Sequence, residues 1–300
     1  MPPVADIRIG PAGWDYPDWK GVVYPGGRGR RQKGFDPLAY LSQFFRTIEI
    51  NSTFYGPATA KTANAWIERV AARPDFRFTA KLWKRFTHER GSAFTTAEVA
   101  TARGGLDVLA GEGRLGAVLL QFPWSFRNDA AANEWLRDLF TAFVGLPLVL
   151  EVRHASWNDP DVHEWLVERG VGLVNVDQPL YGNSLKPSAH VTSGIGYVRL
   201  HGRNYQDWFR KQATRDERYD YLYSAAELKP WVSRIQEIAA RLPEGEIYAV
   251  TNNHHVGKAV VNAEMIESML TGARVKSPPD LYARYRDVLE PYAVPAEGPS

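Results

Sequence analysis

Residues 148–154, LVLEVRH, combine the pattern of a buried strand with groups that can do chemistry. The first three residues are apolar in succession, as in a strand that is covered on both faces. Side chains alternate along a strand, so Glu151 and Arg153 share one face. An unpaired charge in an apolar interior is very unfavourable, so these two groups must pair with partners or line a wet cavity.

The same design recurs where other short apolar segments of the chain end. His201, for example, follows an apolar segment and shares its face with Arg199 and Arg203 by strand period. We expect these polar ends to form one rim. In chain order the rim residues are Trp14, Asp15, Glu49, Asn51, Lys81, His88, Gln121, Glu151, Arg153, His154, Asp177, His201, Arg203, Asn252, Asn253 and His254.

The first interpretation of this rim is a binding site for a small anion. Lys81, Arg153 and Arg203 would attract it, since arginine binds phosphate or carboxylate through two parallel hydrogen bonds. Aromatic side chains near the rim could stack a base or sugar ring, namely Trp14, Tyr55, Trp83, Trp124, Trp157 and Trp208. The structural alternative is that each cation pairs with a rim carboxylate and neutralises it.

On this interpretation Glu49 and Glu151 are the candidate acid and base, and His201 transfers a proton or stabilises charge. The predicted function is a hydrolase-like or lyase-like enzyme acting on a small phosphorylated or otherwise anionic compound, including a nucleotide or a nucleic-acid fragment. The predicted ligand-binding residues are Trp14, Asn51, Tyr55, Lys81, Gln121, Arg153, His154, Asp177, Arg203, Asn252, Asn253 and His254.

Three other functions stay open. The first is a divalent-metal-dependent hydrolase or isomerase, or an endonuclease-like barrel, whose metal would be held by Glu49, Glu151, Asp177 and His201 or His254. Lys81 and Arg153 would repel such a metal, and no HExxH motif or firm cofactor signature is present. Glu49 and Glu151 could cleave a glycosidic bond. Alternatively the rim binds a ligand, a protein or nucleic acid without catalysis, and its carboxylates are structural counterions.

Composition narrows the class of protein. The chain has 300 residues, no cysteine and a formal net charge of +2. The lack of cysteine excludes disulfides and thiolate chemistry, and the small net charge is unlike that of a strongly electrostatic nucleic-acid binder. The N-terminus lacks a signal-peptide pattern, and no apolar run is long enough to cross a bilayer, so we expect a soluble cytoplasmic protein.

The elements that must position these residues alternate between strand and helix. Amphipathic segments with helix-start signals, such as Asp36-Pro37 and the capping box of Thr95 and Glu98, separate most strands. Eight such units predict a single-domain, irregular (β/α)8 TIM barrel over residues 1–300, with loose ends at about 1–5 and 294–300. The predicted strands are 7–10, 47–51, 76–81, 117–122, 148–154, 171–176, 197–202 and 246–250.

Two irregularities accompany the alternation of strand and helix. The segment after the sixth strand shows no convincing helical period, and residues 26–34, GGRGRRQKG, have the glycines and like charges of a mobile surface loop. A TIM barrel carries its active site at the carboxyl ends of its strands. The barrel therefore explains how distant polar segments could meet in one place.

Seven blocks of sequence occur along the chain in a characteristic order. They are IGPAGWDYPDWKG, EINSTFY, FTAKLWKRFTH, LLQFPWSF, LEVRHASW, YVRLHGRN and TNNHHVGKAVVNA. Together these blocks resemble the YecE-like family, domain of unknown function 72. The resemblance spans residue 9 to about 263 and implies a TIM barrel but no established reaction. One difference is Pro11-Ala12, where family members commonly have Thr-Ser, so any ligand contact from those hydroxyls is missing here.

Overall fold

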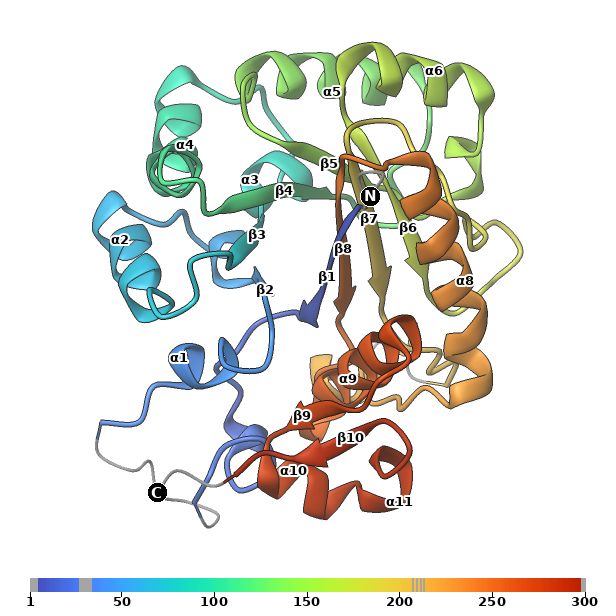
Figure 1. The fold of residues 1–300 in the computed structure, drawn as a ribbon. Helices are drawn as coiled ribbons and strands as arrows, with labels where there is room; N and C mark the ends of the chain where they lie inside the picture. Colours follow the sequence, from blue (N-terminus) through green and yellow to red (C-terminus); the bar gives the residue numbers. More distant parts are fainter. Residues whose placement is uncertain are drawn as a thin grey trace.

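The computed structural model describes residues 5–26, 34–206, 208, 210, 212 and 214–297. Its centre is one sheet of eight parallel strands in the order β1-β8-β7-β6-β5-β4-β3-β2, which confirms the predicted α/β barrel (Figure 1). The strands are β1 (Asp6–Pro11), β2 (Thr47–Ile50), β3 (Arg77–Lys81), β4 (Leu115–Gln121), β5 (Leu148–Glu151), β6 (Gly172–Asp177), β7 (Ile195–Leu200) and β8 (Glu246–Thr251).

The barrel closes where β1 meets β2, the two ends of the strand order. Ala12 pairs with Glu49 across this seam, and the Gly13 amide donates to the Glu49 carbonyl oxygen at 2.8 Å. Below that contact, a Cβ atom on Gly10 would lie 2.0 Å from the carbonyl oxygen of Thr47. Only glycine permits this approach, so Gly10 sets the position of Glu49 relative to the rest of the barrel.

Helices cover the outside of the barrel (Figure 1). The predicted capping boxes form at α4 and α8, and Asp36 accepts from two backbone amides at the start of α1. The helices are α1 (Pro37–Leu41), α2 (Ala60–Arg69), α3 (Lys84–Thr87), α4 (Thr96–Gly111), α5 (Ala130–Ala142), α6 (Pro160–Arg169), α7 (Arg215–Arg218), α8 (Ala225–Arg241), α9 (Lys258–Thr271), α10 (Pro279–Arg284) and α11 (Arg286–Leu289).

The irregularities of the barrel follow the sequence in part. No helix lies between β6 and β7, as predicted. The prediction that the chain is loose from residue 294 is wrong for the first of these residues, because β10 (Ala293–Pro295) pairs in parallel with β9 (Val275–Ser277). Residues 1–4, 27–33 and 298–300, which the sequence predicts as mobile, lie outside the described residues.

Side chains fill the lower barrel interior and leave polar groups above them. A buried apolar cluster of Ala12, Ala117, Leu119, Val149, Val174, Val176, Tyr197, Tyr248 and Val250 forms the interior layer. Alternation then places Arg199 and His201 of the β7 segment on the inward face that Tyr197 begins, and Glu151 on the inward face of Val149. Charged groups at the carboxyl ends therefore rest on an apolar floor. No helix in the described ranges combines the length and apolar character needed to cross a membrane.

Replacing Gly10 by valine should destabilise the barrel, because the new side chain meets the Thr47 carbonyl at the seam. We expect the free energy of unfolding, measured by urea denaturation, to fall by about 3 kcal/mol. Gly91→Ala is the control, since no atom lies within 4 Å of its added Cβ. Equal stability of the two variants would contradict the close approach at Gly10.

Candidate functional site

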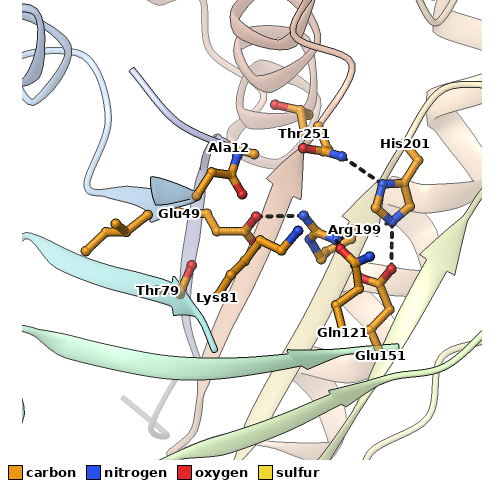
Figure 2. A network of polar contacts seen from close by, with 12 residues as sticks. Ala12, Glu49, Thr79, Lys81, Gln121, Glu151, Arg199, His201 and Thr251 are labelled. Carbon is orange, nitrogen blue, oxygen red and sulfur yellow. Dashed lines mark hydrogen bonds and ion pairs between the residues drawn. The ribbon is translucent and has the colours of Figure 1, made fainter. Parts of the chain in front are cut away.

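Arg199 lies at the centre of the polar groups above the apolar floor. Its side chain is fully buried and bridges two carboxylates, with Nη2 at 2.6 Å from Glu49 Oε1 and Nη1 at 2.5 Å from Glu151 Oε2 (Figure 2). The guanidinium also donates to Gln121 Oε1 at 3.2 Å. Burial opposes its charge, but the two carboxylates outweigh burial and raise the pKa of Arg199 above its ordinary value.

Glu49, at the end of β2, is held on both oxygens. Arg199 donates to one, and the Tyr197 hydroxyl donates to the other at 3.0 Å. The same hydroxyl lies 2.8 Å from Thr79 Oγ1 of β3. Glu49 of β2 is therefore fully buried, with both hydrogen-bond partners on β7 and an indirect link to β3 through Tyr197.

Glu151, at the end of β5, accepts from more donors than Glu49. Arg153 donates to its Oε1 from Nη2 at 2.8 Å and from Nε at 3.1 Å, and His201 Nε2 lies 3.0 Å from the same oxygen. Burial alone would raise the pKa of Glu151, but Arg199, His201 and Arg153 outweigh it and hold that pKa well below its usual range. Glu151 is therefore a carboxylate at neutral pH.

His201 is fully buried between Glu151 and Asn252. The Asn252 amide lies 3.0 Å from Nδ1, so an amide donor there places the ring proton on Nε2, which donates to Glu151. Burial lowers the pKa of His201 to about 3 against the attraction of Glu151, and the nearby guanidinium groups lower it further. The ring is neutral near pH 7, so the low pKa of Glu151 depends chiefly on Arg199 and Arg153. We call Glu49, Arg199, Glu151, Arg153 and His201 the Arg199 network.

Lys81, at the end of β3, lies beside this network but outside its ion pairs (Figure 2). Its ammonium sits 4.3 Å from the centre of the Phe54 ring, and no carboxylate of a described residue is within ion-pairing distance. Burial, together with the positive charge of Arg199, lowers the pKa of Lys81 to about 8. The two carboxylates of the network are balanced by its two guanidinium groups, so Lys81 adds a positive charge that the network does not cancel.

A cavity of about 340 Å³ opens above Lys81, and we call it the Lys81 cavity. Among the residues that the structure describes, none that lines it is acidic. His88 on this wall is neutral at pH 7, because burial and the charge of Lys81 lower its pKa to about 4. The lining residues are Tyr16, Asn51, Phe54, Tyr55, Lys81, His88, Gln121, Arg218, Tyr219, Asn252 and His254.

A second hollow of about 380 Å³, the Trp14 pocket, adjoins the Lys81 cavity. The two share Tyr16, Asn51 and Tyr55 as wall residues. Trp14 meets Trp66 edge to face at 5.9 Å between ring centres, and Tyr55 is 62% exposed. The remaining lining residues are Gly13, Asp15, Ser52, Trp66 and Arg69. A ligand larger than the Lys81 cavity could therefore place a ring against aromatic side chains.

The structure brings together most of the residues that the sequence predicts for the site. The predicted catalytic residues Glu49, Glu151 and His201 lie in the Arg199 network with Arg153, below the cavity wall. Trp14 lines the adjoining pocket. The predicted ligand-binding residues that line the Lys81 cavity itself are Asn51, Tyr55, Lys81, Gln121, Asn252 and His254.

Asp177 and Arg203 do not line either hollow. Val176 belongs to the interior cluster, so Asp177 points out of the barrel, where it accepts from Arg203 Nη2 at 2.9 Å and from the Tyr223 hydroxyl. Arg203 thus pairs with a rim carboxylate, as the structural alternative predicts. The Arg203 guanidinium is occupied by Asp177 rather than directed at the cavity.

His154 and Asn253 also fall outside the two hollows. His154 comes one residue after the inward Arg153, and its Nδ1 lies 2.9 Å from Ser156 Oγ. Asn253 comes one residue after Asn252 and donates to Asn262 Oδ1 at 2.8 Å. A shift of one residue along a strand end reverses the direction of a side chain.

Arg199 is not among the site residues predicted from the sequence, although it joins the two glutamates. The period of β7 indicates its position, because Arg199 lies two residues before His201. Arg218 and Tyr219 also line the cavity without having been predicted. They lie at and just after the end of the short helix α7, in a connection where no periodic signal places a side chain.

The described carboxylates and histidines do not form the metal site that the sequence leaves open as an alternative. In the described parts of the chain, no three or more side chains of histidine, aspartate or glutamate form a group that could hold a metal ion. The oxygens of Glu49, Glu151 and Asp177 instead face guanidinium groups. Such cations occupy the positions that a metal would need.

Comparison with known proteins gives a consistent family and fold. The family described as "Protein of unknown function DUF72" matches residues 8–283. The UPF0759 protein YunF of Bacillus subtilis strain 168 is 26% identical over 277 residues, covering 88% of this chain and 94% of that protein. A crystal structure of a DUF72 family protein from Thermotoga maritima MSB8 is 31% identical, covers 89% of this chain and 99% of that chain, and superposes with a TM-score of 0.76.

A DUF72 family protein from Enterococcus faecalis V583 has the same fold at lower identity. It is 22% identical and covers 88% of this chain and 95% of that chain, with a TM-score of 0.75. The names of these relatives indicate no ligand or reaction.

Replacing Arg199 by methionine should strongly destabilise the protein, because it leaves two buried carboxylates without their shared cation. We expect a loss of about 3–5 kcal/mol in the free energy of unfolding, measured by urea denaturation. The control is Arg241→Met, which removes an exposed ion pair with Glu237 and should cost at most about 1 kcal/mol. A small effect of Arg199→Met would show that the carboxylates do not depend on it.

The neutral state of His201 predicts a dependence of stability on pH. Its pKa is about 3 when folded and near the ordinary 6.5 when unfolded, so between these values the unfolded chain binds a proton that the folded protein does not. This contribution to stability is lost as pH falls from 6.5 toward 3. In His201→Gln the free energy of unfolding should therefore decline less steeply from pH 7 to pH 4 than in the parent. Identical slopes in urea titrations would contradict a buried neutral imidazole.

Proposed function

We propose that this chain, which belongs to the DUF72 family of proteins of unknown function, binds a small phosphorylated or carboxylated compound in the Lys81 cavity and acts on it by acid–base chemistry. The observation that carries the proposal is the charge of the cavity wall. Lys81 and Arg218 contribute cations to it, and none of the described residues that line it is acidic. A confined wall of one sign of charge concentrates ligands of the opposite sign.

The Arg199 network supports an anion rather than a cation as the ligand. Its carboxylates are turned toward Arg199 and Arg153, so they do not offset the charge of Lys81. Phe54 covers one side of the ammonium and removes water from it. A phosphate or carboxylate entering the cavity would supply the counterion that the protein does not.

The acid–base assignment differs from the one that the paired glutamates suggest. Glu151 is held ionised by its guanidinium partners, because its pKa is well below the usual range, and Glu49 is bound by Arg199 and Tyr197. These interactions favour a positioning role for both carboxylates. Lys81, with a pKa of about 8, is the cavity group best matched to exchange a proton near neutral pH.

The adjoining Trp14 pocket favours a ligand with a planar part. An anionic group above Lys81 would leave the rest of the molecule near Tyr55, which borders both hollows. Aromatic walls stack bases and sugar rings. A nucleotide-like compound therefore fits the pair of hollows better than an isolated inorganic anion does.

Anion binding can be tested with inorganic phosphate and adenosine monophosphate. We expect both compounds to raise the Tm of the parent protein. Titration calorimetry should show that Lys81→Gln binds each compound at least 10-fold more weakly, because the loss of one charged contact costs about 1.4 kcal/mol or more, which is a factor of ten in affinity. Lys61→Gln, an exposed lysine on α2, is the matched control and should bind like the parent.

Two outcomes would contradict this proposal. One is equal affinity of Lys81→Gln and the parent for both compounds. The other is binding only to long oligonucleotides with a steep dependence on salt, which would favour the alternative of a non-catalytic nucleic-acid-binding protein.

The role of the Trp14 pocket predicts a different effect at Tyr55. Tyr55→Ala should weaken the binding of adenosine monophosphate by about 5- to 150-fold, in line with the roughly 1–3 kcal/mol of a stacked base, and leave the binding of inorganic phosphate unchanged. Calorimetry with both ligands measures the difference. An equal loss for the two ligands, or no loss for either, would show that no ring stacks on Tyr55.

A further inference from the structure

We infer that Lys81 is a nucleophile that forms an imine with a carbonyl group of the ligand, so that the substrates are carbonyl compounds that also carry a phosphate or carboxylate. The inference rests on the proposed function, since the anionic group is what brings the carbonyl into the Lys81 cavity. It adds a covalent step and a substrate class that the anion site alone does not require. Four features of the structure carry it.

The first feature is the freedom of the Lys81 amine. A lysine that serves only to stabilise the fold is held by a carboxylate, yet the nearby oxygens of Glu49 and Glu151 are directed to guanidinium groups. The described residues offer Lys81 Nζ only the face of Phe54, at 4.3 Å. Its nitrogen is therefore accessible from the cavity and is not engaged in an ion pair.

The second feature is the protonation state of that amine. Only the neutral amine can attack a carbonyl carbon, and an ordinary lysine with a pKa near 10.4 is almost wholly protonated at pH 7. Burial and Arg199 lower the pKa of Lys81 to about 8, so about one molecule in ten carries the neutral amine at pH 7. Desolvation next to another cation is a recognised way to activate a lysine nucleophile.

The third feature is the position of Lys81 on a rigid element. It is the last residue of β3, and its strand neighbours on both sides, β2 and β4, contribute Asn51 and Gln121 to the same cavity. Arg199 donates to Gln121, which fixes that side of the wall. A nucleophile at the end of a barrel strand keeps its position when the loops move.

The fourth feature is a set of proton-carrying side chains on the same wall. His88 is neutral there, and Tyr219 lines the same wall. Arg218 supplies a second cation that can hold the anionic group away from Lys81. The cavity wall thus contains a nucleophile, proton carriers and an anion anchor.

The chemical step needs no oxidant, reductant or metal. The lone pair of neutral Lys81 Nζ forms a bond to the carbonyl carbon while the π electrons of the C=O bond move to oxygen. That oxygen takes a proton and gives a carbinolamine. The C–O bond then breaks, the nitrogen lone pair forms C=N, and the oxygen departs as water that carries one proton from the amine and one from the solvent. The nitrogen keeps its second proton, and this protonated imine is an electron sink that eases bond cleavage at the adjacent carbon.

Trapping with sodium cyanoborohydride tests the imine directly, because this reagent reduces C=N to a stable secondary amine. The full-length protein is incubated at pH 8 with pyruvate or with dihydroxyacetone phosphate, and the adduct is located by intact mass and peptide mapping. We expect one reduced adduct on Lys81 with at least one probe, its formation slowed by inorganic phosphate. Lys61→Gln should form it like the parent.

Lys81→Arg separates this inference from the proposed function. Arginine keeps a positive charge for the anion but cannot form the imine, so this variant should retain phosphate binding within about 10-fold and give no adduct at position 81. Adducts spread over surface lysines, or absent from Lys81 with both probes, would overturn the imine while Lys81-dependent phosphate binding still supported the anion site. Loss of Lys81 dependence in both measurements would overturn both.

Discussion

The bridge from Arg199 to Glu49 and Glu151 is the interaction on which the site depends. It joins β2, β5 and β7 at the carboxyl ends of the barrel, in a fully buried position above an apolar floor. Each of these charges alone would be strongly unfavourable there. Together with Arg153 they form a balanced set, and that balance leaves the ammonium of Lys81 as the charge that the network does not neutralise.

In this arrangement the charges of the Arg199 network stabilise the fold, whereas the amine of Lys81 is left for chemistry. The guanidinium groups stabilise the carboxylates, and they also lower the pKa of the neighbouring amine, because burial and Arg199 act on Lys81 in the same direction. The carboxylates that look like an acid–base pair in the sequence act in the opposite direction and raise the pKa of Lys81, but burial and the guanidinium groups outweigh them. The barrel seam at Gly10 helps to position the network, since it fixes the strand on which Glu49 lies.

The fold follows from the sequence because its signals are local and repeated. Apolar strands, helix caps at Asp36, Thr95 and Ser224, and turns at regular intervals predict the eight units without knowledge of distant contacts. The site follows only in part. The predicted rim residues lie at the carboxyl ends of the strands, but a strand end has two faces. A difference of one residue directs Asp177 outward while Val176 points inward. Arg199 was within reach of the same reasoning, whereas Tyr219 was not, because it belongs to an irregular connection.

The measurement closest to the centre of this account is the pKa of the Lys81 amine, obtained from the pH dependence of its Nζ and Cε resonances in NMR spectra of the folded protein. A pKa of about 8 is the result that the balanced Arg199 network and the buried amine predict. A pKa near the ordinary value of lysine, about 10.4, would contradict the account, since Lys81 would then have a solvated or ion-paired ammonium.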